Sequence, residues 1–280
     1  MTVAIVTDSA AALPSELIER HRIEVVPLWL HIAGATFRDD ELALDEVLAQ
    51  PAGAVKTAAP APAEFAERVE RARREGPVVV LTLASSMSAV HQSALIGARS
   101  VDARVPVIDT RTAAGAQALV VLAAARAAEG GAGVEAVVAA ARTAIARVRL
   151  VAFVADLERL VASGRVPDAA RWLADRLGAR PLFEMRGGRP RPLRPAFSRD
   201  GALDRIVASC LEDRRRTPRL HVAVLSARDA DVAEDLRRRL ERRRHLDAQE
   251  LASCFVGSFS PAMVAHTGGE VAGLAWWYEP

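Results

Sequence analysis

The 280-residue chain contains few of the residues that cross-link proteins or hold them in membranes. Its two cysteines, Cys210 and Cys254, are too few for a disulfide framework or a multi-cysteine zinc site, so we expect a reducing compartment. The longest apolar run, residues 118–125, is far shorter than the roughly 20 residues of a membrane-spanning helix. The first residues lack a basic segment followed by an apolar one, which predicts no signal peptide. We therefore expect a cytoplasmic protein with at most transient membrane contact.

Lysine is almost absent: Lys56 is the only one, and every other basic residue is an arginine. The basic residues nearly balance the acidic ones, 37 against 35, for a net charge of +2. Arginines cluster at residues 214–216, 237–239 and 242–244. Around the last two clusters, acidic residues alternate with the arginines, while Val232, Leu236 and Leu240 recur every four residues. This pattern predicts a helix with a solvated arginine face and no nucleic-acid partner.

Short apolar runs alternate with helical stretches in the first half of the chain. We expect strands at residues 4–6, 23–28, 78–83 and 105–109, and helices at 63–75, 90–100 and 113–129. This alternation is typical of a mostly parallel sheet with helices on both faces. After residue 150 the pattern changes to strands at 151–154, 220–225 and 274–278, with a hairpin turn at Gly187 and Gly188. The sequence therefore predicts an α/β fold of two domains, an N-terminal α/β domain (residues 1–149) and a C-terminal α+β domain (150–280), with a ligand cleft between them.

Two polar segments in the first 62 residues are candidates for ligand binding, because parallel sheets bind ligands beyond the carboxyl ends of their strands. Asp8 and Ser9 directly follow the first strand, although a helix cap would explain them equally well. Thr57 supplies a hydroxyl in residues 56–62, which we expect to form a loop stiffened by two prolines. An ordinary capping loop before the next helix is the alternative for Thr57.

Two further polar segments carry serine and histidine side chains. Ser85, Ser86 and Ser88 follow the third strand and open a helix, whose free N–H groups and hydroxyls would hold a carboxylate or phosphate; a serine-rich helix cap is the alternative. His266 lies between an apolar stretch and a glycine turn, where it would change charge near neutral pH or serve a structural role. The six histidines lack metal-ligand spacing, and no phosphate loop, dinucleotide fingerprint or nucleophile elbow is present, so we expect no cofactor.

Taken in order along the chain, these segments resemble the DegV-like family of bacterial fatty-acid-binding proteins. The resemblance extends from residue 4 to about residue 277, and the order of the motifs gives it its specificity. The motifs are residues 5–14 (IVTDSAAALP), 25–28 (VVPL), 34–39 (GATFRD), 56–62 (KTAAPAP), 85–94 (SSMSAVHQSA), 107–110 (VIDT), 157–166 (LERLVASGRV), 180–183 (RPLF) and 266–269 (HTGG).

The resemblance implies that the protein binds one long-chain fatty acid in a tunnel between its domains and has no catalytic residues of its own. The resemblance implies that the carboxylate is bound by Thr57, Ser85, Ser86, Ser88 and His266, and it leaves open which serine makes the contact. The implied neighbours of the site are Asp8, Ser9, His91 and Arg165. Arg165 would lie near the mouth of the site. Some family members present the lipid to a separate ATP-binding subunit of a fatty acid kinase, which phosphorylates the carboxylate for phospholipid synthesis, so a kinase subunit is a further implied partner.

The chain departs from the family motifs at several positions. Ala58 and Ala59 stand where the family has serine and glutamine, and Ala89, Val90 and His91 stand where it has glycine, threonine and tyrosine. Glu270 adds a negative charge near His266 in the sequence. Fewer hydroxyls are therefore available for a carboxylate, and His91 offers another hydrogen-bonding group.

Two other functions use some of the same residues. A hydrolase would combine Ser85, Ser86 or Ser88 with His266 or His91 and with Asp8 or Asp109. A small-ketone-binding protein resembling dihydroxyacetone kinases would form an adduct on His266.

Overall fold

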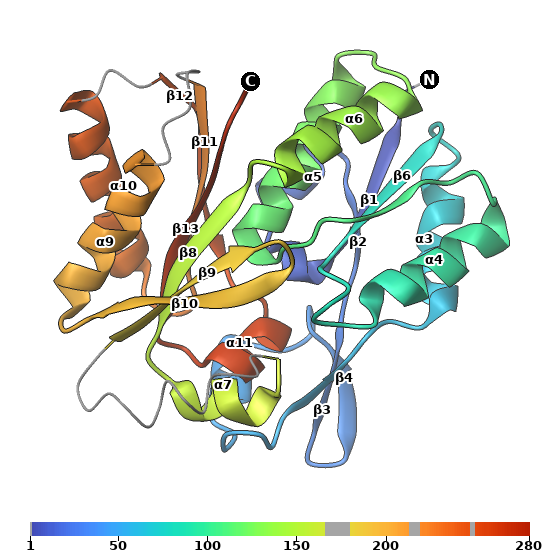
Figure 1. The fold of residues 1–280 in the computed structure, drawn as a ribbon. Helices are drawn as coiled ribbons and strands as arrows, with labels where there is room; N and C mark the ends of the chain where they lie inside the picture. The colour runs from blue at the N-terminus through green and yellow to red at the C-terminus, as the bar shows by residue number, and fades with distance from the viewer. Residues whose placement is uncertain (1, 166–179, 213–218, 247–249) are drawn as a thin grey trace.

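The computed structural model describes residues 2–165, 180–212, 219–246 and 250–280. Figure 1 shows two large β-sheets standing beside each other, with helices α5 (Ala114–Glu129) and α6 (Val134–Ile145) between them and further helices outside. This layered α/β arrangement confirms the predicted fold class. None of the described helices is both long and apolar enough to cross a lipid bilayer.

The first large sheet is parallel throughout, as predicted. Its strands lie in the order β2 (Glu24–Val26), β1 (Ala4–Asp8), β6 (Val78–Thr82) and β7 (Val107–Asp109). Every residue of β6 is buried, as expected for a strand that is covered on both faces. Helices α3 (Pro62–Ala72) and α4 (Val90–Val101) cover the outer face, while α5 lies on the inner one.

The second large sheet contains six strands and is mixed. Its order is β10 (Arg189–Ala196), β9 (Arg180–Arg186), β8 (Arg149–Val154), β13 (Val271–Tyr278), β11 (Arg219–Ser226) and β12 (Glu250–Ser258). Gly187 and Gly188 both have positive φ and form the predicted two-residue turn between β9 and β10. Helices α9 (Arg199–Glu212) and α10 (Ala230–Leu246) cover its outer face.

Helix α10 confirms the apolar stripe predicted from the sequence. Val232, Leu236 and Leu240 are buried against the six-stranded sheet. The arginines at 237–239 pair with acidic residues of α10 and α9, as in the contact of Arg239 with Asp235 at 2.9 Å. The charges of these arginines are therefore compensated; Arg238 is exposed, while Arg237 and Arg239 are partly buried. Residues 214–216 lie outside the described residues.

Helix α5 connects the two large sheets. Thirteen of its sixteen residues are buried, and it contacts β1 on one side and β11 and β13 on the other. At Gly115 the approach is so close that a Cβ atom would lie 2.8 Å from that of Ala223. One apolar core runs from Val3 to Trp277 through this helix. The domain boundary predicted at residues 149–150 falls within β8, and the division into two domains stays a prediction.

A third, small sheet was not predicted from the sequence. It is antiparallel, with the order β4 (Ala35–Arg38), β3 (Trp29–Ile32) and β5 (Lys56–Ala58). The prediction of a loop at residues 56–62 was therefore wrong for residues 56–58. A three-residue strand is too short to show an alternating pattern, and its partner β3 lies far away in the sequence. Because Thr57 pairs with Leu30, its backbone is held by a strand.

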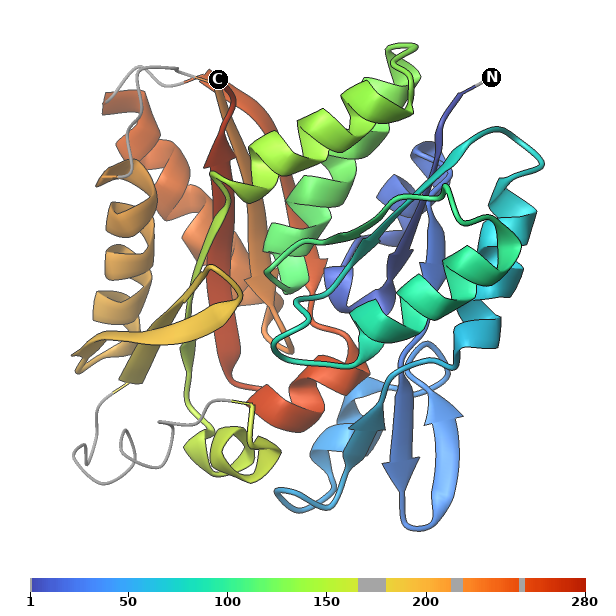
Figure 2. The same cartoon turned by 45° about the vertical axis from the view of Figure 1, so that its right-hand side comes forward.

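Short helices complete the fold around this small sheet. They are the 3-10 helix η1 (Ser9–Ala11), α1 (Ser15–Arg20), α2 (Leu44–Leu48), α7 (Leu157–Ser163) and α11 (Pro261–Thr267). Figure 2 shows α11 low in the molecule, between the six-stranded sheet and the small sheet. It contacts α7, α2 and β5, and so brings the C-terminal half of the chain against Thr57.

Candidate ligand cavity

An apolar cavity of about 110 Å³ lies between elements of the two halves of the chain. Its walls come from the small sheet, the segment before α4, the strands β8 and β9, and the helices α7 and α11. Its apolar lining includes Leu28, Leu83, Leu150, Leu160, Phe183 and Phe259. Such a lining suits a hydrocarbon chain, which gains free energy when it leaves water.

Methionine is concentrated at this cavity. The chain has four methionines, and the three that follow Met1, namely Met87, Met185 and Met263, all line it. A methionine side chain is unbranched and flexible, so it adapts to ligands of different shape. No sequence motif indicated these residues, although the rarity of methionine was a usable signal.

The polar side chains of the cavity centre on Thr57 and His266. Thr57 Oγ1 lies 2.8 Å from His266 Nε2, which joins β5 to the last turn of α11 across 209 sequence positions. Arg165 Nη2 donates to the same hydroxyl at 3.4 Å, and its Nη1 donates to the carbonyl of Ser163 at 2.5 Å. Thr57, Arg165 and His266 also line a smaller pocket of about 50 Å³, together with Lys56 and Arg159. The polar group therefore lies at the boundary between the apolar cavity and a cationic pocket.

Electrostatics keep the imidazole of His266 neutral. Burial, reinforced by the positive charges of Arg165 and Lys56, lowers the pKa of His266 from 6.5 to about 4. The sequence suggested a histidine that changes charge near neutral pH, but the unliganded site does not provide one. At neutral pH the positive charge beside Thr57 belongs to Arg165 and Lys56 instead. A bound carboxylate would counteract this effect and raise the pKa of His266.

We expect the ring of His266 to titrate near pH 4 in protein freed of any bound carboxylate, and at a higher pH if a carboxylate occupies the site. The measurement is two-dimensional ¹H–¹⁵N NMR of the imidazoles, with His266→Gln used to assign the signal. Measurements of unfolding against pH would not isolate His266. The lowered pKa of His266 contributes stability above about pH 6.5 that is lost as the pH falls toward 4. The raised pKa values of Asp8 and Asp39, both about 6, change the stability in the opposite direction in that range. An unliganded midpoint of 6 or above would contradict the environment described for His266.

Only one of the three predicted serines lines the cavity. Ser88 does so, and its Oγ accepts a hydrogen bond from the N–H of Val90 at 3.4 Å, just before the N-cap of α4 at Ala89. Ser85 is exposed and donates to Asp109 Oδ2 at 2.5 Å. Ser86 donates to the carbonyl of Gly188 in the hairpin turn. The structure therefore brings Ser88 together with Thr57 and His266, and places Ser85 and Ser86 toward β7 and the β9–β10 turn.

Asp8 and Ser9 hold the surrounding backbone, and His91 contacts a side chain. Asp8 is fully buried and accepts from the N–H groups of Ala10 and Leu83, at 3.1 and 2.8 Å. Ser9 donates to Asp39 at 2.7 Å and accepts from Leu28, and His91 Nδ1 lies 2.9 Å from Thr82 Oγ1. Their neighbours Ala10 and Leu83 line the cavity, but these three side chains do not. Asp8 is the N-cap of η1, as the alternative of a helix cap predicted.

The residues of the hydrolase alternative do not form a triad in the described part of the chain. His266 pairs with Thr57, and His91 pairs with Thr82. The serines bond to Asp109, Gly188 and Val90, and among the described residues none of them is hydrogen-bonded to a histidine.

Comparisons with known proteins agree with this architecture. The family model described as "Uncharacterised protein, DegV family" matches residues 2–279. A DegV domain-containing protein of Streptomyces coelicolor is 32% identical over 277 residues, which cover 97% of both chains. A protein of Thermotoga maritima named "Fatty acid-binding protein" is 28% identical and covers 84% of this chain and 85% of its own.

Solved structures show the same fold. A DegV family protein of Thermus thermophilus, whose structure is described as fatty acid binding, superposes with a TM-score of 0.89 at 26% identity over all of both chains. A structure described as a DegV lipid-binding protein of Thermotoga maritima gives a TM-score of 0.86 at 23% identity, over 99% of both chains. With a family model that spans nearly every residue and a relative above 30% identity, this chain belongs to the DegV family.

Proposed function

We propose that the protein binds one long-chain fatty acid, with its tail in the apolar cavity and its carboxylate at Thr57 and His266. The observation that carries this proposal is the hydrogen-bonded Thr57–His266 pair, with Arg165 beside it, at the boundary of an otherwise apolar cavity. The named fatty-acid-binding relatives support the same ligand class.

The lining of the cavity accounts for both parts of this ligand. Each buried methylene contributes about 0.8 kcal/mol, so the gain from the tail grows with the length of chain that the cavity admits, less the cost of ordering both partners. The head group would accept hydrogen bonds from the Thr57 hydroxyl and the Arg165 guanidinium, and Ser88 also lines this cavity. In this arrangement His266 orients the threonine hydroxyl, and the arriving negative charge raises the pKa of its imidazole.

We further propose that the bound fatty acid is presented to a separate ATP-dependent kinase subunit. A carboxylate oxygen would attack the γ-phosphorus of ATP, the bond to the β-phosphate oxygen would break, and acyl phosphate and ADP would result. Arg165 is exposed to solvent while it touches Thr57, so a partner subunit would find it accessible at the head group. This protein would supply binding and orientation, and the kinase subunit would supply the nucleotide.

Native mass spectrometry of the purified protein tests the binding proposal. We expect a complex heavier than the chain by the mass of one fatty acid, and extraction should release that acid. Delipidated protein should regain the mass shift on addition of palmitate or oleate. A protein that carries no lipid and takes up neither acid would contradict the proposal.

The presentation step has its own test. Delipidated protein loaded with palmitate, a fatty acid kinase subunit and ATP should yield acyl phosphate, trapped by hydroxylamine as a hydroxamate. Product that forms equally with free palmitate would show that presentation is unnecessary, even if the fatty acid binds.

A further inference from the structure

A second hollow, of about 580 Å³, lies at the carboxyl end of β7 and is separate from the polar group at Thr57. It is formed by the segment after β7, the end of α6, the start of β8 and the end of β9. Its volume is within the range of about 300–1,000 Å³ that is typical of small-molecule sites. In parallel α/β sheets, ligands bind beyond the carboxyl ends of the strands, which is where this hollow lies.

The hollow is lined by five arginines and a single acidic residue, Asp109. The arginines are Arg111, Arg142, Arg147, Arg149 and Arg186. Arg149 is paired with Glu184 at 2.6 Å. Within the described ranges, the side chains of Arg142, Arg147 and Arg186 form neither an ion pair nor a hydrogen bond. Three arginine side chains of this hollow therefore have no partner among the described residues, while Asp109 and Glu184 offset part of the remaining positive charge.

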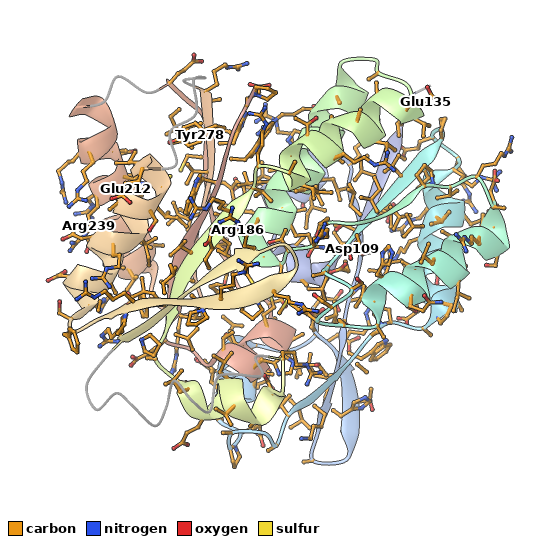
Figure 3. The ribbon with its side chains drawn as sticks, in the orientation of Figure 1. Asp109, Glu135, Arg186, Glu212, Arg239 and Tyr278 are labelled. Atoms are coloured by element: carbon orange, nitrogen blue, oxygen red, sulfur yellow. The ribbon has the colours of Figure 1, made fainter. Side chains whose placement is uncertain are left out.

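This arrangement differs from the other arginine-rich surface. Arg239, on the outer helices in Figure 3, contacts Asp200, Asp204 and Asp235. Arg186 and Asp109 lie near the middle of the same view. The high arginine content of the chain is enough to explain the ion-paired arginines of α10. It does not explain why unpaired guanidinium groups gather around one hollow.

Local contacts hold one wall of the hollow in place. The N–H of Arg111 donates to Asp109 Oδ1 at 2.7 Å, and Ser85 occupies the other oxygen of the same carboxylate. The backbone of Arg111 is in the left-handed region, with φ of 55°, which non-glycine residues rarely adopt. Its guanidinium reaches the carbonyl of Gly187 at 3.4 Å and so ties the segment after β7 to the hairpin turn.

We propose that this hollow binds a small ligand carrying a chain of phosphate groups, such as a nucleoside triphosphate. Guanidinium groups bind phosphate oxygens through paired, charge-assisted hydrogen bonds, and several arginines around one hollow match several linked phosphates. A small ligand is favoured over a flat macromolecular surface because the charges line a concave space. Nothing in this inference requires the fatty acid to bind.

Isothermal titration calorimetry at low ionic strength tests the proposal with inorganic triphosphate as the probe. We expect saturable binding to the full chain, weaker binding of orthophosphate, and a loss of affinity as salt is added. The Arg147→Gln/Arg186→Gln double variant should weaken triphosphate binding by about tenfold or more for each arginine removed. Arg142→Gln alone should weaken it by about tenfold and serves as the milder second variant.

Arg99→Gln is the matched control, because Arg99 is exposed on α4 away from the hollow and the substitution removes the same charge. ATP and coenzyme A are titrated for comparison. If they bind with the same affinity as triphosphate, the hollow recognises the phosphates alone. If they bind more tightly, the hollow also contacts the nucleoside. Both results support the proposal. The proposal would be overturned if triphosphate did not bind, or if Arg99→Gln weakened its binding as much as the variants in the hollow. It would also be overturned if the arginines bound phosphatidylglycerol vesicles but not triphosphate.

Discussion

Replacing Thr57 with valine and His266 with alanine is expected to lower the affinity for palmitate by about 100-fold or more. The two side chains supply hydrogen-bonding groups at the head of the cavity, and a hydrogen bond to a charged group is worth about 1.5–3 kcal/mol. The double variant should remain folded. Thr57 and His266 are hydrogen-bonded to each other, so replacing both leaves no buried polar group that has lost its partner. Fluorescent fatty-acid displacement measures the affinity, and circular dichroism verifies the fold.

Ser85→Ala is the control for this experiment, since Ser85 lies outside the cavity lining and bonds to Asp109. We expect its palmitate affinity to match that of the parent protein. If Ser85→Ala weakened binding as much as the double variant, or if the double variant retained palmitate, the assignment of the head group to Thr57 and His266 would be wrong.

The largest loss of stability is expected from Leu119→Ala in helix α5. Leu119 is completely buried in the core that joins both large sheets. Truncating a buried leucine to alanine removes apolar contacts and leaves a cavity, which costs about 2–5 kcal/mol of unfolding free energy. Urea unfolding followed by tryptophan fluorescence and by circular dichroism measures this difference.

Ile96→Ala in α4 is the matched truncation, because Ile96 is 50% exposed. It should cost less than about 1 kcal/mol, since little apolar surface is lost from the core. A loss below about 1 kcal/mol for Leu119→Ala as well would contradict the central role of α5. Two separate transitions in the parent protein would show that the sheets unfold independently of this helix.

The sequence predicts those parts of the fold that depend on local patterns. The apolar run of β6, the glycine pair between β9 and β10 and the four-residue stripe of α10 each appear within one short window, and the structure has all three. The small sheet around Thr57 escaped prediction because β5 has only three residues and pairs with a distant strand.

The candidate site shows the same limit more clearly. Motif order selects Thr57, the serines and His266, but it does not reveal that Ser88 lines the cavity while Ser85 turns to Asp109, because neighbouring side chains of one turn point in different directions. The neutral state of His266 depends first on its burial and then on the charges of Arg165 and Lys56, and all of these arise only from the folded arrangement of β5, α7 and α11. The three methionines could have been selected from the sequence as candidates, because methionine is rare in this chain and all three line the cavity.

The wall between the apolar cavity and the arginine-lined hollow is built from consecutive residues. Ala113 and Leu150 face the cavity while Thr112 and Arg149 face the hollow, and Met185 borders both. Met185 is the residue that the two linings share, so a ligand that displaces its side chain in one compartment changes the lining of the other. If an occupant of one compartment moves Met185 and so changes the affinity of the other compartment, the second occupant must change the affinity of the first by the same factor.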